Sequence, residues 1–487
     1  MKQLSKFIFF ILIMFILIGF SGCSSQMQNT LYVTSIEQTI GNQENIYTVY
    51  YSDGTTSTFT VSNGSEKNEE TDVTIDDLYE KYVIEYGDIS YSDFLELYFS
   101  NKDILNMDNS YAIAKCLLSS LKIYSEFIET TTINIRPGQT YTSSDTVLST
   151  GSGVIWSIDE DEDGYTYLVT NYHVVYDASA DTSKNGGVKT ARKMHCYLYG
   201  SESSPVGTNE TDSEGYTVYD YGSYAVECEY VGGSITSDIA VLRTKTSSLK
   251  EINPYIQEVT LADNYYVGQA AVAIGNPEGE GISVTQGIVS VENEYITLNI
   301  DGTSRNYRSI RIDTALYSGN SGGGLYNSEG ELIGITNAGD TSDQNINYAV
   351  PLEIVKGTVE NILYYYTDCD DSTNGAYKIT IGITVQTQNS KYVYDQNLGY
   401  GNIIEEVVIS SVSEKSIAET LGLEVGDIVK RIIINNTEYI IERSFHISDI
   451  ILTMHMGDSI QIVCQRNDEQ YITCLLYTSD AADDLIG

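Results

Sequence analysis

The chain has 487 residues, a length that allows about three domains, and hydrophobic residues make up 41% of it, enough for real cores. Lys and Arg number 26 against 68 Asp and Glu, so the formal net charge is −42. This acidity argues against nucleic acid as a partner, because binding to phosphates relies on Lys and Arg; a well-solvated acidic surface is the simpler interpretation.

The N-terminus has the pattern of a targeting segment. Lys2 and Lys6 precede an apolar run over 7–20, as in signal peptides. The run ends in Phe-Ser-Gly-Cys23, which resembles the lipobox of lipoproteins, with Phe where Leu is usual. We therefore expect residues 1–22 to be a lipoprotein signal peptide and Cys23 to carry the lipid anchor. An uncleaved anchor would likewise leave the protein on the extracytoplasmic face of the cell membrane.

Residues 23–72 are expected to form a small β module followed by an acidic linker. Two alternating runs flank the pair Asp53-Gly54, which is a strong hairpin signal. After them, residues 73–109 predict a helical segment, with Thr74 as the cap of its first helix.

A further helix is predicted over 109–129. Apolar residues repeat there at helical spacing and would share one face. They are Ile113, Cys116, Leu117, Leu121, Tyr124 and Ile128.

From 130 to 355, short strands alternate with turns, as a domain of two β-barrels requires. Two stretches, 176–193 and 200–221, are rich in Ser, Thr, Asp and Gly. We expect both to be loop insertions that gate access to a site or bridge protomers.

The acidic stretch 159–164 opens like a calcium loop. Its twelfth position, however, is Thr170 rather than the bidentate Glu that such a loop needs. We therefore favour an acidic hairpin turn over a metal site.

Three residues in this region have the chemistry of a catalytic triad. His173 lies in a β-branched run that predicts a buried strand ending at a polar group, and Asp238 opens another apolar strand. Ser321 lies among glycines, which let the backbone turn sharply and approach a substrate. A serine hydroxyl is a weak nucleophile until a base takes its proton. The order His, Asp, Ser is that of chymotrypsin.

Two alternatives bear on this interpretation. Gly-Asn-Ser-Gly-Gly also fits the nucleophile elbow of α/β-hydrolases, a fold that needs a helix after the serine and a later histidine. The residues after Ser321 instead predict a strand over 330–336, and the later histidines, His446 and His455, lie in a different domain. A protease scaffold without activity is disfavoured because all three triad members are present.

Seven short motifs resemble those of HtrA/DegP-type trypsin-like serine proteases. They occur in the family's order across about half the chain, and each marks a separate strand or loop of one double barrel. The motifs are Gly151-Ser-Gly-Val-Ile155, Thr170-Asn-Tyr-His-Val-Val175, Ser237-Asp-Ile-Ala-Val-Leu242, Ala273-Ile-Gly-Asn-Pro277, Gln286-Gly-Ile-Val-Ser290, Gly319-Asn-Ser-Gly-Gly323 and Tyr348-Ala-Val-Pro351.

The resemblance implies a fold class. The chain is expected to be mainly β, with a chymotrypsin-like protease domain of two six-stranded β-barrels over 110–366 and an α+β PDZ domain after it. A short helix over 352–364 would close the protease domain.

The resemblance also implies roles for the triad. Ser321 would attack the scissile carbonyl, His173 would carry the proton, and Asp238 would orient the imidazole. The N–H groups of Gly319 and Ser321, with Asn320 between them, would form the oxyanion hole. No cofactor is needed for this chemistry.

A specificity pocket is expected at Ala315, Thr336 and Asn337. Ala315 lies six residues before the predicted nucleophile, where trypsin carries the acidic floor of its pocket. A Lys or Arg side chain would therefore lack a charge partner. We expect cleavage after Val, Ala or Ile.

After a linker over 367–376, residues 377–474 resemble a bacterial PDZ domain. A helix over 447–454 would flank its peptide groove, and 391–401 would be a long insertion. The residues expected to receive a C-terminal carboxylate are Ile381, Gly382 and Ile383.

Six cysteines follow Cys23. Cys196 and Cys228 lie on two strands that are expected to pair. Both a disulfide and a pair of buried free thiols are compatible with their positions. The others are Cys116, Cys369, Cys464 and Cys474.

The expected partners are unfolded or exported polypeptides, C-terminal peptides at the PDZ domain and the membrane, together with further copies of the chain in a homotrimer. Two other functions remain open: a non-proteolytic surface binding protein that contains a PDZ domain, and a processing protease dedicated to one substrate.

The last residues, 475–487, are expected to be a non-native tail. The strand alternation stops after Thr473, and the residues that follow include few that could pack. We expect no core contacts from about residue 474 onward.

Overall fold

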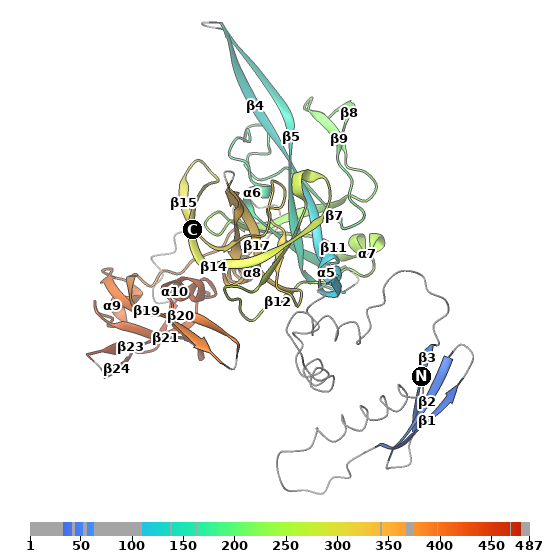
Figure 1. The fold of residues 1–487 in the computed structure, drawn as a ribbon. Coiled ribbons are helices and arrows are strands. Elements are labelled where there is room, and N and C mark those ends of the chain that lie inside the picture. Colours follow the sequence, from blue (N-terminus) through green and yellow to red (C-terminus); the bar gives the residue numbers. More distant parts are fainter. Residues whose placement is uncertain are drawn as a thin grey trace. The chain divides into compact units, whose positions relative to one another are not determined.

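The computed structural model of the chain describes residues 33–40, 44–51, 56–62, 110–136, 139–161, 163–340, 343–366, 374–396, 398–467 and 469–478 (Figure 1). The chain divides into two compact units, Met1–Phe99 and Ser100–Gly487. The predicted signal peptide, Cys23 and the helices predicted before residue 109 lie outside the described residues.

The first unit contains a three-stranded antiparallel sheet in the order β1-β2-β3. Strands β2 and β3 pair across the predicted turn, with Tyr47 opposite Phe59, so the hairpin predicted around Asp53-Gly54 is confirmed. The strands are β1 (Val33–Ile40), β2 (Glu44–Tyr51) and β3 (Thr56–Ser62).

The described part of the second unit starts with a helix, followed by a closed six-stranded barrel in the order β10-β11-β6-β5-β4-β7. Apolar side chains such as Ile123, Phe127 and Leu168 fill its interior. The elements are α5 (Ser110–Leu117), β4 (Ser120–Arg136), β5 (Gln139–Ile158), β6 (Tyr165–Thr170), β7 (Lys193–Leu198), β10 (Val226–Ser234) and β11 (Ile239–Lys245).

The helix predicted over 109–129 is wrong beyond Leu117. From Ser120 the chain is strand β4, which pairs with β5 on one side and β7 on the other. Backbone hydrogen bonds to two neighbours outweigh the helical repeat of the apolar residues, because helix propensity is a weak prior against tertiary pairing.

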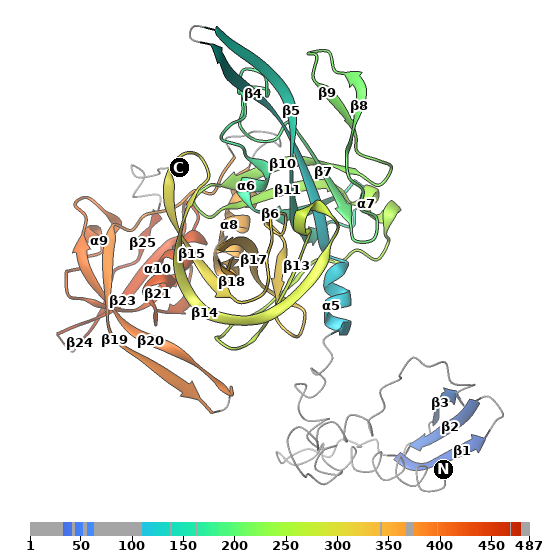
Figure 2. The same cartoon turned by 45° about the horizontal axis from the view of Figure 1, so that its top comes forward.

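Two hairpins extend this barrel (Figure 2). The outer parts of β4 and β5 project away from it as one long ribbon. The stretch 200–221, expected to be a loop, contains a second hairpin made of β8 (Val206–Thr211) and β9 (Thr217–Asp220).

The acidic stretch 159–164 is a turn, as expected. It joins β5 to β6, and the Asp159 carboxylate accepts a hydrogen bond from the Asp161 N–H at 3.1 Å. A short helix, α7 (Thr246–Ile252), follows β11.

A second barrel follows. Six strands close into a ring in the order β17-β16-β13-β14-β15-β18, and β12 adds to β17 in parallel. The expected class, mainly β with two six-stranded barrels, is therefore confirmed. The strands are β12 (Thr260–Leu261), β13 (Ala270–Gly275), β14 (Ser283–Asn299), β15 (Ser304–Ile312), β16 (Gly324–Tyr326), β17 (Glu331–Asp340) and β18 (Asp343–Pro351).

A 14-residue helix, α8 (Leu352–Tyr365), follows the second barrel. It buries Val355, Val359 and Ile362 in the core that both barrels share. The helix predicted over 352–364 is thus confirmed.

The C-terminal domain is a sheet in the order β19-β20-β21-β23-β24 with two helices. Strand β19 lies at the edge of this sheet, and the stretch 391–401 extends its hairpin with β20. The elements are β19 (Ile383–Asp395), β20 (Tyr400–Val412), α9 (Ile417–Thr420), β21 (Ile428–Ile434), β22 (Thr437–Ile440), α10 (Ser444–Leu452), β23 (Ser459–Arg466), β24 (Glu469–Ile472) and β25 (Leu476–Tyr477).

The expectation that no residue after 474 contacts a core is wrong for the first few of them. Strand β25 pairs with β23, and Leu476 packs against the core of the C-terminal domain. The buried Thr478 hydroxyl donates to the His455 carbonyl at 3.0 Å. Residues from 479 onward lie outside the described part.

Helix α10 joins the C-terminal domain to the second barrel through buried charges. Arg308 on β15 donates to Asp449 on α10 at 2.5 Å, and its guanidinium lies 4.3 Å from the ring centroid of Phe445. Arg443 donates to Glu292 at 2.7 Å. Burial raises the pKa of Asp449 to about 7, against the opposite effect of Arg308.

Candidate active site

His173 lies on a single helical turn, α6 (Tyr172–Val175), rather than on the buried strand that its β-branched neighbours predict. Strand β6 ends at Thr170. The buried side chain of Asn171 donates to the carbonyl oxygen of Asp238 at 2.9 Å, which holds the start of the helical turn against the Asp238 loop.

Asp238 is fully buried between β10 and β11. Its φ is 53°, a left-handed conformation in which few residues other than glycine are found. This backbone aims the carboxylate at α6: Oδ1 accepts a hydrogen bond from the His173 backbone N–H at 3.0 Å, and Oδ2 lies 2.7 Å from His173 Nδ1. Both oxygens thus orient one histidine.

The environment of His173 favours a proton on its ring. Burial alone would lower the pKa of His173, but the charge and the hydrogen bond of Asp238 outweigh it, so the pKa lies above its ordinary value. The side chain remains 33% exposed, and Nε2 has no hydrogen-bond partner within the described residues.

Ser321 lies on the turn between β15 and β16. Its Oγ donates to the carbonyl oxygen of Asn337 at 2.8 Å, and in the part of the chain that the structure describes no hydrogen bond joins it to His173. The next residue, Gly322, has φ +89°, and a Cβ there would lie 2.2 Å from the Ser152 carbonyl oxygen and 3.1 Å from the Asn171 nitrogen. The turn therefore packs directly against the start of the segment that carries His173.

The N–H groups of Gly319 and Ser321 have no protein acceptor within the described residues. Within the described residues neither group donates a hydrogen bond, while the carbonyl on the far side of each peptide is held. Ser318 O accepts from the Glu278 N–H at 2.6 Å, and Asn320 O accepts from Thr336 Oγ1 at 2.6 Å. Because a trans peptide is planar, fixing each carbonyl aims the N–H the other way.

Ser152 ties this turn to the preceding barrel. Its buried hydroxyl donates to the Gly319 carbonyl at 2.7 Å and accepts from the Asn276 N–H at 2.8 Å. Sequence reasoning included Ser152 and Asn276 in motifs but gave neither a role, because the bonds span 167 and 124 residues.

The three residues predicted for the specificity pocket have different surroundings. The Ala315 carbonyl accepts from Thr285 Oγ1 at 2.8 Å. The Thr336 hydroxyl is buried and supports the Ser321 turn, as described above. Asn337 is 4% exposed, and its amide nitrogen and oxygen are buried without a hydrogen-bond partner among the residues that the structure describes.

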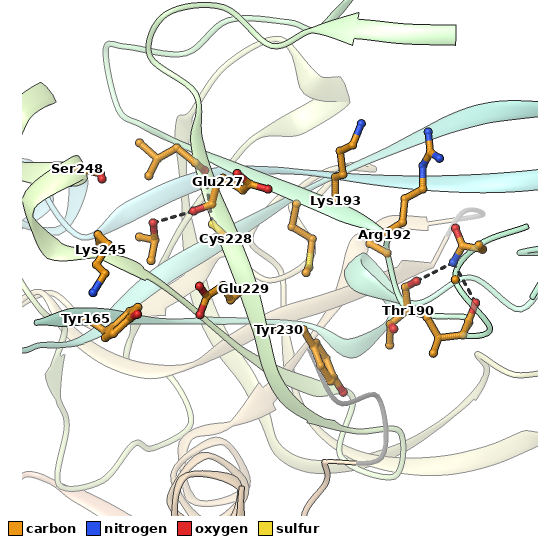
Figure 3. A pocket seen from close by; sticks show the side chains of 17 residues that line it. Tyr165, Thr190, Arg192, Lys193, Glu227, Cys228, Glu229, Tyr230, Lys245 and Ser248 are labelled. Atoms are coloured by element: carbon orange, nitrogen blue, oxygen red, sulfur yellow. Dashed lines mark hydrogen bonds between the residues drawn. The ribbon is translucent and has the colours of Figure 1, made fainter. Parts of the chain in front are cut away.

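A separate pocket of about 660 Å³ lies on the first barrel (Figure 3). Its lining includes Lys193, Glu227, Glu229 and Lys245, and none of the three triad candidates. Cys228 also lines it; the thiols of Cys228 and its diagonal neighbour Cys196 are free and buried, so the structure contains no disulfide between them.

The arrangement is similar to that of known proteins. Residues 151–335 match the family model described as a trypsin-like peptidase domain. The chain is 25% identical over 351 residues to the serine protease Do-like HtrA of Lactococcus lactis subsp. cremoris, covering 69% of this chain and 72% of that protein. It is 27% identical over 353 residues to the serine endoprotease DegS of Haemophilus influenzae, covering 71% and 80%.

Solved structures show likeness at lower identity. A crystal structure of the serine endoprotease from Yersinia pestis has 21% identity and a TM-score of 0.39, covering 76% of this chain and 97% of that one. The HtrA-type protease AlgW with a decapeptide has 21% identity and a TM-score of 0.43, covering 76% and 98%.

No helix among residues with a described structure is both long and apolar enough to span a membrane. The two six-stranded barrels, the family match over 151–335 and the similarity to HtrA and DegS lead to one conclusion. The chain contains a trypsin-like peptidase domain and is a serine endopeptidase similar to the HtrA and DegS proteases.

Proposed function

We propose that the catalytic groups of this endopeptidase are Ser321, His173 and Asp238, and that it cleaves unfolded or damaged exported polypeptides. The observation that carries the assignment is that both Asp238 carboxylate oxygens contact His173, one at its backbone N–H and one at Nδ1. The adjacent Ser321 turn carries the N–H groups of Gly319 and Ser321, which have no acceptor within the described residues. Asp238 fixes the tautomer that leaves Nε2 as the base.

In this mechanism the Ser321 hydroxyl first turns from the Asn337 carbonyl towards His173 Nε2. His173 takes the hydroxyl proton while Oγ bonds to the scissile carbonyl carbon, whose oxygen becomes an anion between the N–H groups of Gly319 and Ser321. The imidazolium then gives its proton to the leaving amine as the C–N bond breaks. Water, deprotonated by His173, releases the acyl group and restores Ser321.

A fluorophosphonate probe tests this function on the full chain. We expect the probe to label the wild type and to leave Ser321→Ala unlabelled, because only an activated serine reacts. Equal labelling of both would contradict the assignment. No labelling of either would favour the alternative of a non-proteolytic binding protein.

Cleavage is expected after Val, Ala or Ile, because Ala315 offers no acidic partner to a Lys or Arg side chain. The proposal is tested by digesting a peptide library and sequencing the new ends. Dominant cleavage after Lys or Arg would contradict it. The same library separates a broad quality-control protease from a processing enzyme with one substrate.

The proposal extends to the C-terminal domain as a PDZ domain that binds C-terminal peptides. Strand β19 is an edge strand, open to the addition of a peptide strand. Before it, the left-handed Gly382 packs so closely that a Cβ would lie 2.2 Å from Ser416 Cβ. The Ile381 carbonyl accepts from the Ala418 N–H at 2.8 Å, which holds the loop that would receive the carboxylate.

We expect the full chain to bind peptides with a free C-terminus and to bind the same peptides with an amidated C-terminus at least about tenfold more weakly, because the lost charge-assisted hydrogen bonds are worth about 1.5–3 kcal/mol. Fluorescence anisotropy with a displayed peptide set measures this. Equal affinity for the free and the amidated peptides would contradict the proposal that this domain binds a C-terminal carboxylate.

The last part of the proposal is the membrane anchor on the extracytoplasmic face. Cys23 is expected to take up a clickable fatty acid in cells, and Cys23→Ala to lose it. Labelling that persists in Cys23→Ala would place the anchor elsewhere.

A further inference from the structure

Lys122 is a buried cation without a carboxylate partner. The residue lies on β4, is 2% exposed, and donates from Nζ to the carbonyl oxygen of Gly279 at 2.7 Å. Across the described residues, no Asp or Glu oxygen lies within 4.0 Å of Nζ. Nζ also lies 5.0 Å from the ring centroid of Tyr124, so a carbonyl oxygen and an aromatic face, rather than an acid, are the partners of this buried ammonium group.

Gly279 belongs to a strained turn. The turn is the short 3₁₀ helix η1 (Pro277–Gly279), in which Glu278 has φ 54° and Gly279 has φ 76°. Two successive left-handed residues, one of them not glycine, persist only where the surroundings hold them. The hydrogen bond from Lys122 to the Gly279 carbonyl restrains the backbone at the end of this turn.

The same turn supports one donor of the oxyanion hole. The Glu278 N–H donates to the Ser318 carbonyl at 2.6 Å, which directs the Gly319 N–H away from the turn. Gly319 itself packs against the turn: a Cβ on it would lie 2.3 Å from the Asn276 carbonyl oxygen. A small shift of η1 would therefore move the Gly319 N–H.

We propose that Lys122 is a positioning residue for the oxyanion hole: through Gly279 and Glu278 it holds the Gly319 N–H on the anion that forms at the scissile carbonyl oxygen. This role rests on the proposed triad chemistry, and it concerns the transition state rather than the binding of substrate.

The experiment compares an oxygen ester with its thionoester, both cleaved after the same residue, on the full chain. Sulfur is a weak acceptor of hydrogen bonds, so cleavage of the thionoester depends little on the oxyanion hole. We expect Lys122→Met to lower kcat for the oxygen ester by about 10- to 100-fold, somewhat less than the loss of an oxyanion donor. KM should change by less than about twofold, and thionoester cleavage by less than about threefold.

Three variants control this comparison. Lys122→Arg keeps the charge and a donor, and we expect it to recover most of the oxygen-ester activity. Lys122→Gln keeps a donor without the charge, and it replaces Lys122→Met if that variant does not fold. Ser125→Ala removes another buried polar group of β4, whose hydroxyl has no partner among the described residues, and should leave both esters unchanged.

Equal losses on both esters, with a matching fall in the thermal midpoint, would show a packing role and overturn the proposal. No loss on either ester would also overturn it. If the wild type cleaves neither ester, or if Ser321→Ala cleaves them equally well, the proposed triad fails and this role fails with it.

Discussion

Replacing Ser321 by alanine is expected to lower kcat/KM by about a millionfold while the protein stays folded, because the members of a triad act as a unit. Among the described residues the Ser321 hydroxyl makes one hydrogen bond, to the Asn337 carbonyl. Its loss costs about 1 kcal/mol of stability, little against the stability of a domain. Cleavage of casein and of a quenched peptide measures the rate, and circular dichroism checks the fold.

His173→Ala is the matched variant for this test. We expect it to lose about as much activity as Ser321→Ala, and the double variant to lose no more than either single one. A double variant that is slower by the product of the two losses would contradict a shared mechanism. Full activity in Ser321→Ala would contradict the nucleophile itself.

The second large effect is expected from Asp238→Asn, which should lower kcat by about ten-thousandfold, as in other proteases with this triad. Asp238 uses both oxygens on His173, one at the backbone N–H and one at Nδ1. An amide has one acceptor oxygen and an NH2 group that only donates, so it cannot accept at both positions, and it removes the charge that stabilises the imidazolium. The volume of the side chain is nearly unchanged, so the fold should persist.

The same substitution is expected to change the pH profile. His173 acts as a base only when it is neutral, so activity falls as pH drops through its pKa. Asp238 holds that pKa above its ordinary value against the lowering effect of burial. Wild-type kcat/KM should therefore decline from a pH above about 6.5, and the residual activity of Asp238→Asn should persist to lower pH. If the activity of the wild type and of Asp238→Asn fell at the same pH on the acid side, Asp238 would not raise the pKa of His173, and this prediction would be wrong.

The pH dependence of folding stability should have the opposite sign to that of activity: the contact between His173 and Asp238 stabilises the fold more at low pH. The folded state binds the His173 proton more tightly than the unfolded chain does, so the contact stabilises the fold fully below the unfolded pKa of His. This contribution is lost as pH rises through the higher folded value. The free energy of unfolding, measured by denaturant titration, should therefore differ more between the wild type and Asp238→Asn below the unfolded pKa of His173 than above its folded pKa.

Much of the candidate site was readable from the sequence because its requirements are local. Glycines are needed around Ser321, since Gly319 and Gly322 adopt left-handed backbones in close contact with other parts of the chain. The two-barrel class was readable for a similar reason, because short β-branched runs between turns repeat along the domain. Both the glycine pattern and the short strand runs are formed by residues close together in the sequence, so they can be recognised without the tertiary structure.

The contacts that complete the site depend on tertiary structure alone. The run before His173 forms the predicted strand only as far as Thr170; His173 itself lies on the helical turn α6, next to Asn171, whose side chain donates to the Asp238 carbonyl 67 residues away. The helical repeat before residue 129 was overruled from Ser120 onward because β4 finds two partner strands.

The sequence by itself therefore determined the kind of fold and indicated which side chains are candidates for the chemistry. Only the tertiary structure decided which hydrogen bonds hold the site together. The side chains of Ser321, Ser152 and Lys122 donate to the carbonyl oxygens of Asn337, Gly319 and Gly279, respectively. The physical reason is that a buried donor must find an acceptor wherever the folded chain provides one. For Lys122 that acceptor lies 157 residues away, and no local pattern records it.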